Sequence, residues 1–417
     1  MHLPLHKTLA VAAGNALEFY DFLTFSFFSI QIGHTFFPAG QTANGLLYTL
    51  ATFGMGFVTR PLGGLVIGRY GDRAGRRQAM LLTFTLMGVA LLGLALTPSY
   101  AQIGVAAPVL LLIFRLLQGF ALGGEVGPST AYLVEVAPPR RRGLYVSVQF
   151  ATQDLAVLAA GMVGFTLARL LTPEALDDWG WRVAFLLGVA IVPLGLWMRS
   201  SLPETLHAAR RADPAGEHPK VPARLLVLGL FLLLSTTISG YTLDFMTTYA
   251  QDSLKMSASL AFGATMVVGF AQSTSDVAAG MLSDRFGRRP VMLCGFALLL
   301  PLVVPAFMLM NQGHGVATVY GAMAVLSVLS AMAAGPIMVT IAESLPAAVR
   351  SGTLALLYAV TISCFGGSTQ FAVQWLTTTT GSPLAPAWYM TGALVLGAVA
   401  ALLIGESAPR RNWGAGP

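Results

Sequence analysis

Charged residues are scarce in this sequence. Only 10% of its 417 residues are Asp, Glu, Lys or Arg, whereas 55% are hydrophobic. A soluble domain carries about 25% charged residues, so this chain has too few to cover a surface that faces water. The composition therefore excludes an ordinary soluble protein and indicates a surface that faces lipid. One membrane-spanning helix needs about 20 apolar residues, so this length allows about twelve such helices joined by short loops.

Cysteines and catalytic motifs are also nearly absent. Cys294 and Cys364 both lie in apolar segments, and we expect small packing residues there, not a disulfide, metal site or catalytic thiol. The six histidines lack metal-ligand spacing, and no Gly-x-x-x-x-Gly-Lys-Ser/Thr phosphate-binding loop occurs. We therefore predict no enzyme, no metal site and no cofactor other than coupling protons. The net charge of +6 does not indicate nucleic-acid binding, because the basic residues cluster in loops between apolar stretches.

Twelve apolar stretches predict an all-α polytopic membrane protein. They are 8–32, 44–69, 79–97, 105–136, 143–169, 180–200, 223–250, 258–283, 290–311, 316–343, 350–376 and 386–405. One long polar stretch separates the sixth from the seventh. We therefore expect an N-terminal six-helix bundle, a cytoplasmic linker and a C-terminal six-helix bundle, with bounds 1–200, 201–222 and 223–417.

The positions of the basic residues predict the orientation. Of the 24 Lys and Arg residues, 19 fall in loops or ends on one side of the predicted spans, three on the other side and two within spans. Cytoplasmic loops carry an excess of Lys and Arg, so the first side is cytoplasmic and both termini lie inside.

A loop motif occurs twice, at nearly half the chain length apart. Gly68-Arg-Tyr-Gly-Asp-Arg-Ala-Gly-Arg-Arg77 matches Gly280-Met-Leu-Ser-Asp-Arg-Phe-Gly-Arg-Arg289. A second pair, Glu135-x-x-Pro-x-x-x-Arg142 and Glu343-x-x-Pro-x-x-x-Arg350, lies after the fourth and tenth predicted spans. The offsets of 212 and 208 residues indicate duplication of a six-helix unit.

The repeated loop has a physical interpretation. Glycine permits a tight turn between two helices, and the Asp can lie at the positive end of a helix or pair with an Arg. A simple positively charged anchor needs neither the Asp nor the glycines. We therefore predict a structural or gating role, without substrate contact, for Gly68, Asp72, Arg73, Gly75, Arg76, Asp284, Arg285, Gly287 and Arg288.

Polar residues inside the N-terminal spans predict a binding site. Charges at the bilayer centre are costly and usually face a cavity. An ion pair of Glu18 or Asp21 with Arg115 could simply hold two helices together, but such a pair would account for only part of the polar residues in these spans. Arg binds carboxylates through its planar fork, and amide side chains bind carboxylate or hydroxyl oxygens, so we expect a small anionic substrate. The residues are Asn15, Glu18, Asp21, Arg60, Arg115, Gln118, Glu125, Gln149 and Gln153.

The C-terminal half carries fewer polar residues within its spans. Asp244 and Asp276 have no obvious Arg partner in that half, and a buried acid without such a partner can hold a proton. We therefore predict proton coupling there. Tyr241, Gln272 and Tyr358 are candidate substrate contacts, although membrane tyrosines also serve as packing or interface anchors.

Several motifs together resemble one transporter family. They are the two Asp-Arg-x-Gly-Arg-Arg loops, Gly14-Asn-x-x-Glu-x-x-Asp-Phe22, Arg60-Pro-x-Gly63, Arg115-x-x-Gln-Gly-x-x-x-Gly-x-Glu125, Trp179-Gly-Trp-Arg182 and Pro203-Glu-Thr205. This set resembles the metabolite–proton symporters of the major facilitator superfamily. Thr35-Phe-Phe-Pro38, Gln149-x-x-x-Gln153 and Phe365-Gly-Gly367 resemble the bacterial citrate and tricarballylate subgroup.

The resemblance implies a central cavity between two six-helix bundles and alternating access by rocking. It implies proton-driven import of citrate or a related tricarboxylate across a bacterial inner membrane. Arg60 and Arg115 would meet carboxylates, and Glu18 and Asp21 would couple protons, to which we add Glu125, Asp244 and Asp276. Asn15, Gln118, Gln149 and Gln153 would make polar contacts. We expect a monomer whose partners are the substrate, protons and lipid.

Other functions remain open. A dicarboxylate or a shikimate-like monocarboxylate is an alternative substrate, and the acids of the C-terminal half would also suit a betaine. A membrane sensor without transport is an alternative of another class, but paired gating loops and intramembrane charges disfavour it. An ion channel is disfavoured because the acids do not form a repeated ring.

Overall fold

The computed structural model describes residues 19–37, 42–74, 76–123, 130, 133–134, 137–200, 221–313 and 315–408, and their regular structure is entirely helical. A helix covers 19–27. The later elements of the N-terminal part are α2 (Ser29–Phe36), α3 (Thr42–Val58), α4 (Arg60–Ala74), α5 (Arg76–Leu96), α6 (Tyr100–Ile103), α7 (Ala106–Leu122), η1 (Pro139–Arg141), α9 (Arg142–Leu170), α10 (Pro173–Ala175), η2 (Leu176–Gly180) and α11 (Trp181–Ser200).

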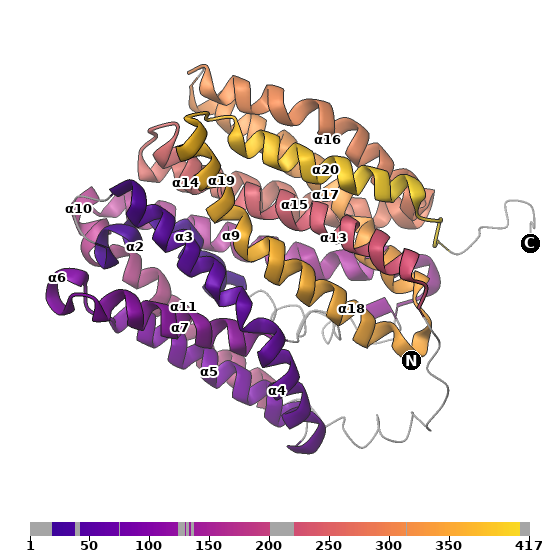
Figure 1. The fold of residues 1–417 in the computed structure, drawn as a ribbon, viewed down its shortest axis with the longest axis horizontal. Helices are drawn as coiled ribbons and strands as arrows, with labels where there is room; N and C mark the ends of the chain where they lie inside the picture. Colours follow the sequence, from indigo (N-terminus) through magenta and orange to yellow (C-terminus); the bar gives the residue numbers. More distant parts are fainter. Residues whose placement is uncertain are drawn as a thin grey trace, which may run out of the picture.

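The C-terminal part continues the same all-α architecture. Its elements are α13 (Ala223–Asp244), α14 (Met246–Asp252), α15 (Ala258–Phe286), α16 (Arg288–Asn311), α17 (Val316–Ser344), α18 (Ala347–Thr361), η3 (Ile362–Gly366), α19 (Gly367–Thr380) and α20 (Ala385–Leu403). Figure 1 shows α3, α4, α5 and α7 at the lower left and α16, α17 and α20 at the top, with the long helices running beside one another.

The predicted all-α polytopic fold is confirmed. Each of the twelve predicted stretches contains helix among the described residues. Seven helical stretches in the described part are long and apolar enough to cross a membrane, and Leu81–Leu96 and Ala106–Leu122 are shorter apolar helices. Some predicted spans are interrupted: the second divides into α3 and α4, the seventh into α13 and α14, and the eleventh into α18, η3 and α19.

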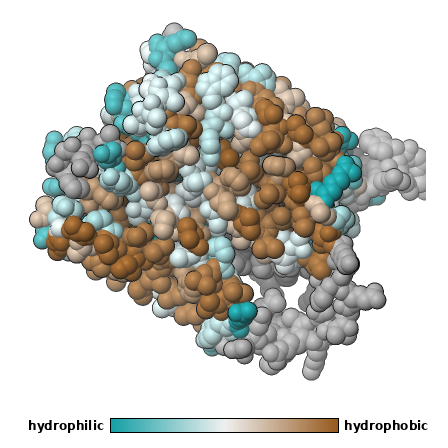
Figure 2. Space-filling model, viewed as in Figure 1, coloured by the Kyte–Doolittle hydropathy of each residue, from teal (hydrophilic) through white to brown (hydrophobic). Residues whose placement is uncertain are grey.

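The outer surface is largely apolar. Figure 2 shows hydrophobic residues over much of one face of the molecule. Large exposed apolar side chains occur along many helices, among them Val109, Leu170 and Leu356. A soluble monomer rarely exposes such continuous apolar area, so these faces fit contact with lipid. Cys294 and Cys364 lie on the exposed surface with free thiols, so the expectation that they are packing residues was wrong.

Buried apolar residues form two main clusters. One draws mainly on residues before Ala223 and includes Phe22, Phe53 and Trp181; the other draws mainly on residues after it and includes Phe296 and Phe307. The predicted linker, 201–222, lies outside the described residues except for its last two positions. The exact division into two bundles stays a prediction.

Helices α9 and α15 pack closely although they are far apart in sequence. A Cβ atom at Gly269 of α15 would lie 2.9 Å from the carbonyl oxygen of Asp154 on α9. Near the other end of the contact, a Cβ at Gly280 would lie 2.8 Å from the carbonyl oxygen of Gly143. Real Cβ atoms do not approach so closely, so glycine at these positions permits the contact between the helices.

Candidate functional site

A cavity of about 170 Å³ lies between helices from both parts of the chain. The helix at 19–27 and α9 line one side of it, and α13, α15, α17 and α18 line the other. Of the predicted site residues, the cavity brings together Gln153, Tyr241, Asp244, Gln272, Asp276 and Tyr358. Five of these come from the C-terminal half, and the set includes both predicted substrate contacts and predicted proton-coupling residues.

The charged residues that line this cavity are all acidic within the described part of the chain. They are Asp154 on α9, Asp244 on α13 and Asp276 on α15. Asp154 was not among the predicted site residues. Its place one residue after Gln153, inside an apolar stretch, was the signal that could have identified it.

Arg60 and Arg115 lie behind an aromatic layer and are not among the described residues that line the cavity. The two guanidinium groups flank the ring of Phe22, at 4.4 Å for Arg60 and 4.1 Å for Arg115. Arg60 also stacks on Phe57 at 4.2 Å, and Arg115 on Phe53 at 4.7 Å. Such stacking contributes about 2 kcal/mol or more when the cation is desolvated.

Tyr241 connects the aromatic layer to the cavity. Its ring meets Phe57 edge-on at 5.5 Å and Phe53 at 6.3 Å, while the tyrosine itself lines the cavity. Tyr241 therefore contacts both the rings that stack on the buried cations and the acid-lined space.

Arg115 is fully buried and incompletely bonded. Its Nη1 donates a short hydrogen bond to Oε1 of Gln118, which is also fully buried. Nε and Nη2 of Arg115 and Nε2 of Gln118 have no hydrogen-bond partner within the described part of the structure. Because an unpaired buried charge costs several kcal/mol, this group is a strong candidate to receive an anion.

The other predicted binding and coupling residues either are buried away from the cavity or lie outside the described residues. Asp21 is buried, and its Oδ1 has no hydrogen-bond partner among the described residues. It lies against Gly188 of α11, which places it inside the N-terminal helices. Gln149 is buried and accepts a hydrogen bond from Thr130 at 3.1 Å. Asn15, Glu18 and Glu125 lie outside the described residues.

Three polar pairs connect the first helices to the C-terminal half. Ser26 Oγ donates to Gln370 Oε1 at 2.8 Å, Ser29 and Thr248 share a hydrogen bond of 2.9 Å, and Gln31 Nε2 donates to Gln251 at 3.4 Å. These contacts were not predicted. They are single hydroxyl or amide groups without a sequence pattern, so only the fold shows that they meet.

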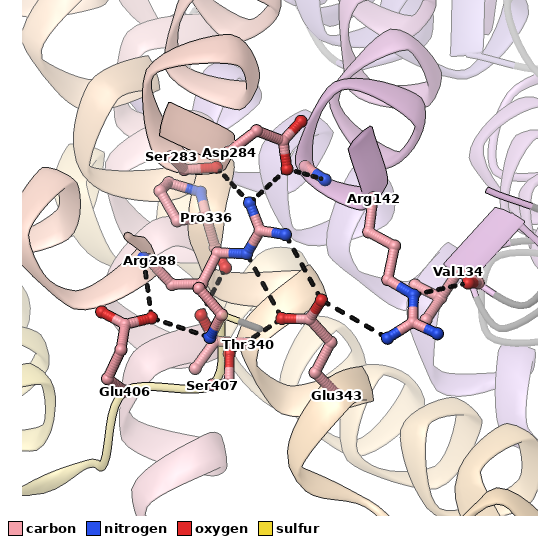
Figure 3. A network of polar contacts seen from close by, with 12 residues as sticks. Val134, Arg142, Ser283, Asp284, Arg288, Pro336, Thr340, Glu343, Glu406 and Ser407 are labelled. Carbon is pink, nitrogen blue, oxygen red and sulfur yellow. Dashed lines mark hydrogen bonds and ion pairs between the residues drawn. The ribbon is translucent and has the colours of Figure 1, made fainter. Parts of the chain in front are cut away.

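The second loop motif forms a network that reaches α9 (Figure 3). Asp284 accepts hydrogen bonds of 2.9 Å from the backbone N–H groups of both Gly143 and Leu144, in the first turn of α9. Its carboxylate also pairs with Arg288 at 2.6 Å. A carboxylate is stabilised at a helix N-terminus because the free N–H groups and the helix dipole are positive there. Asp284 thus both lies at the N-terminus of a helix and pairs with an Arg, as the sequence suggested. The helix that it caps, α9, belongs to the other half of the chain.

Arg288 and Glu343 extend this network. The buried Arg288 guanidinium donates to both carboxylate oxygens of Glu343, at 3.2 and 3.3 Å. Arg142 approaches the same carboxylate at 3.8 Å. Figure 3 shows Glu343 between the two arginines. Since Arg142 begins α9 and Glu343 lies in the last turn of α17, the network holds three distant segments together.

The loop itself turns at Gly287, whose φ of 103° is a conformation that L side chains rarely adopt. Arg288 and Arg289 then begin α16, and their N–H groups donate to Glu406 at 2.9 and 3.0 Å. Arg285, at the end of α15, is exposed and lies over the ring of Phe286. Glu406 caps α16 from the far end of the chain, a contact that the sequence did not indicate.

The first copy of the motif is only partly described. Gly68, Asp72 and Arg73 fall within α4 and Arg76 begins α5, while Gly75 lies outside the described residues. The second repeated motif is comparable in both copies. Arg142 Nε donates to the carbonyl of Val134, and Arg350 Nε to that of Ala342, each eight residues earlier. This equivalent contact agrees with the duplication inferred from the sequence.

A second polar cluster lies beyond the end of the first predicted span. His34 Nδ1 and Asp177 Oδ2 are 2.9 Å apart, and the hydrogen bond to Asp177 raises the pKa of His34 although burial opposes the shift. Trp181 Nε1 donates to Thr35 at 3.1 Å, and Thr35 donates to the Asp177 carbonyl. These bonds attach α2 to η2 and α11.

The sequence also matches characterised proteins. The citrate–proton symporter of Klebsiella pneumoniae is 37% identical over 400 residues, covering 94% of this chain and 90% of the relative. The α-ketoglutarate permease of Escherichia coli (strain K12) is 34% identical, with 97% and 94% covered. The proline/betaine transporter of the same strain is 31% identical, with 99% and 86% covered.

The fold matches a solved transporter structure. A D-xylose–proton symporter superposes with a TM-score of 0.76 at 20% identity, covering 96% of this chain and 97% of that chain. Residues 11–369 match the profile of the Major Facilitator Superfamily. This span and the relatives above 30% identity agree with the helical architecture, and the chain belongs to the Major Facilitator Superfamily of membrane transporters.

Proposed function

We propose that this transporter is a proton-coupled symporter that imports citrate or a related tricarboxylate. The observation that carries the proposal is the buried Arg115 guanidinium, whose Nε and Nη2 lack partners in the described structure. A carboxylate would satisfy both N–H groups through the planar fork of the guanidinium. Arg60 on the other face of Phe22 adds a second positive charge for a substrate with several carboxylates.

The relatives support an organic acid. Two of those described above are named for citrate and α-ketoglutarate, and both match this chain over nearly its whole length. In this proposal the substrate displaces the aromatic layer of Phe22, Phe53 and Phe57 to reach the arginines. Asn15, Gln118, Gln149, Gln153, Tyr241, Gln272 and Tyr358 complete its contacts.

Proton coupling is proposed for the intramembrane acids. Asp244 and Asp276 line the cavity, and Asp21 is buried among the N-terminal helices against Gly188. Glu18 and Glu125 are further candidates from the sequence. Because a carboxyl group in such a site can be neutral or charged, its protonation can follow substrate binding.

The transport cycle follows from the repeat. Residues 1–200 and 223–417 act as two six-helix halves that rock about the cavity, and the repeated loops act as gates. The protein works as a monomer in a bacterial inner membrane, with both termini in the cytoplasm. The bias of Lys and Arg supports this orientation.

A zwitterion such as a betaine is the second candidate substrate. Asp154, Asp244 and Asp276 are the charged residues that line the cavity within the described structure, and Tyr241 and Tyr358 lie among them. Acids and aromatic faces favour a quaternary ammonium group. In this alternative the substrate's cationic group would occupy the cavity while its carboxylate pointed to Arg115.

Uptake into proteoliposomes distinguishes these candidates. With an imposed pH gradient, labelled citrate should accumulate, and an uncoupler should abolish accumulation. Unlabelled tricarballylate, α-ketoglutarate, shikimate and glycine betaine then serve as competitors. Competition by glycine betaine without citrate uptake would support the zwitterion. Citrate uptake that ignores the uncoupler would reject proton coupling, and no uptake of any compound would favour a sensor.

A further inference from the structure

Two aspartates from distant parts of the chain meet in the cavity. Asp154 on α9 and Asp276 on α15 both line this cavity of about 170 Å³, and the two helices pack against each other beside it. Two carboxylates that face one small space repel each other, and a proton on one of them relieves the repulsion and supplies a hydrogen-bond donor. The cavity therefore favours one proton for this pair of side chains.

The packing of the helices fixes this meeting. Asp154 lies at one of the close contacts between α9 and α15, because its carbonyl oxygen would be 2.9 Å from a Cβ at Gly269. A Cβ at Gly335 of α17 would lie 2.9 Å from the Ala279 side chain and 3.9 Å from the Asp276 carbonyl oxygen, so α17 also packs closely on the segment that carries Asp276. The pair is thus held by backbone contacts and not by flexible loops.

The surroundings disfavour ionisation of both acids. The other titratable groups that line the cavity in the described structure are Asp244 and Tyr241 on α13 and Tyr358 on α18. The lining residues of the first helix, α17 and η3 carry no titratable side chain. No described base lines the space to balance two negative charges, and two carboxylates so close together retain a proton.

Gln153 gives an independent sign that the site is incomplete. It is 8% exposed, lines the same cavity, and its Nε2 has no hydrogen-bond partner among the described residues. A buried amide N–H without an acceptor costs about 1–3 kcal/mol, so the site is built to receive an acceptor group. Asp154 of the pair and this amide donor are consecutive residues of α9.

We propose that Asp154 and Asp276 share one proton and form the coupling site of this transporter. The proposal rests on the proposed function, proton symport, and assigns it to a pair that crosses the two predicted halves. Rocking of residues 1–200 against 223–417 changes the distance between the two carboxyl groups. The shared proton is held while they are together and released when they separate, which links proton movement to alternating access.

Accumulation and exchange assays test the pair. At zero membrane potential, a gradient of one pH unit supports about tenfold accumulation of labelled citrate for each coupled proton. Asp154→Asn and Asp276→Asn should each reduce accumulation to about the equilibrium level while keeping citrate exchange, which needs no net proton movement. The double variant should match the single variants, because removing either acid already removes the shared proton. Asp178→Asn, at an exposed acid, is the matched control and should behave as wild type.

Infrared spectroscopy tests the pair without any substrate. At neutral pH the wild type should show C=O stretching bands of protonated carboxyl groups, and the wild-type-minus-variant difference spectrum of each single variant should contain the band of the shared proton. If the wild type did not accumulate citrate but the infrared difference band were present, citrate symport would be refuted while the shared proton of Asp154 and Asp276 would be supported. Coupled uptake in both variants, loss of exchange together with coupling, or a difference spectrum that lacks this band in either variant would overturn the pair.

Discussion

Replacing Asp284 with Asn should destabilise the contact between the second loop motif and α9. The Asp284 carboxylate accepts two backbone N–H bonds of 2.9 Å and an Arg288 bond of 2.6 Å, and its side chain is 10% exposed. Hydrogen bonds to charged groups contribute about 1.5–3 kcal/mol each, and Asn offers one acceptor oxygen and no charge. Glu343 still pairs with Arg288 in the variant. We therefore expect the free energy of unfolding to fall by about 3 kcal/mol. This is the lower end of the cost of removing one partner from a buried ion pair.

The intrinsic fluorescence of the purified protein in detergent would follow this change on heating. A loss of about 3 kcal/mol should lower the melting temperature of a chain of 417 residues by about 3 °C. Asp178→Asn removes an exposed carboxylate and should leave it unchanged. If Asp284→Asn melted with the wild type, the carboxylate would not stabilise the N-terminus of α9, and the interpretation of the loop as an anchor between the halves would fail.

Two further predictions concern the binding site and the outer cluster. Arg115→Lys keeps the charge but loses the fork, so citrate should bind about tenfold or more weakly by calorimetry, and unchanged affinity would exclude a carboxylate contact. The pKa of His34 is raised by Asp177, so its bond adds stability below pH 6.5, the ordinary value, and loses it as the pH rises through the raised value. The melting temperature of the wild type should exceed that of His34→Gln at pH 5.5 and match it at pH 9; an equal difference at both would contradict the assignment.

The sequence predicted the fold well because the membrane-spanning helices of such a protein are marked by their hydropathy. Each span must supply about 20 apolar residues, and each loop must carry polar ones. The stretch 143–169 therefore corresponds to α9, Arg142–Leu170, nearly residue by residue. Breaks were harder to predict: the division of α18 from α19 at η3 occurs within an apolar stretch, where hydropathy gives no signal.

The candidate site was predictable in its residue types but not in its arrangement. Periodicity placed Arg115 and Gln118 on one face of a helix, and they do bond to each other. It could not show that Phe22 and Phe53 would cover Arg115, because aromatic residues in a span resemble ordinary packing residues. Nor could it show Asp154 opposite Asp276, since that pairing depends on how α9 meets α15.

The buried arginines and the acids of the cavity form two separate groups of opposite charge. Arg60 and Arg115 are separated from the acid-lined cavity by Tyr241 and the phenylalanines it touches. Within the described structure no ion pair joins Arg115 to an acid, and its Nε and Nη2 have no hydrogen-bond partner, so this group retains its capacity to bind. An anionic substrate would satisfy Arg115, and a proton would satisfy the acids. Neither ligand substitutes for the other, because each binds charge of the opposite sign, and this is the requirement for a symporter that carries both together.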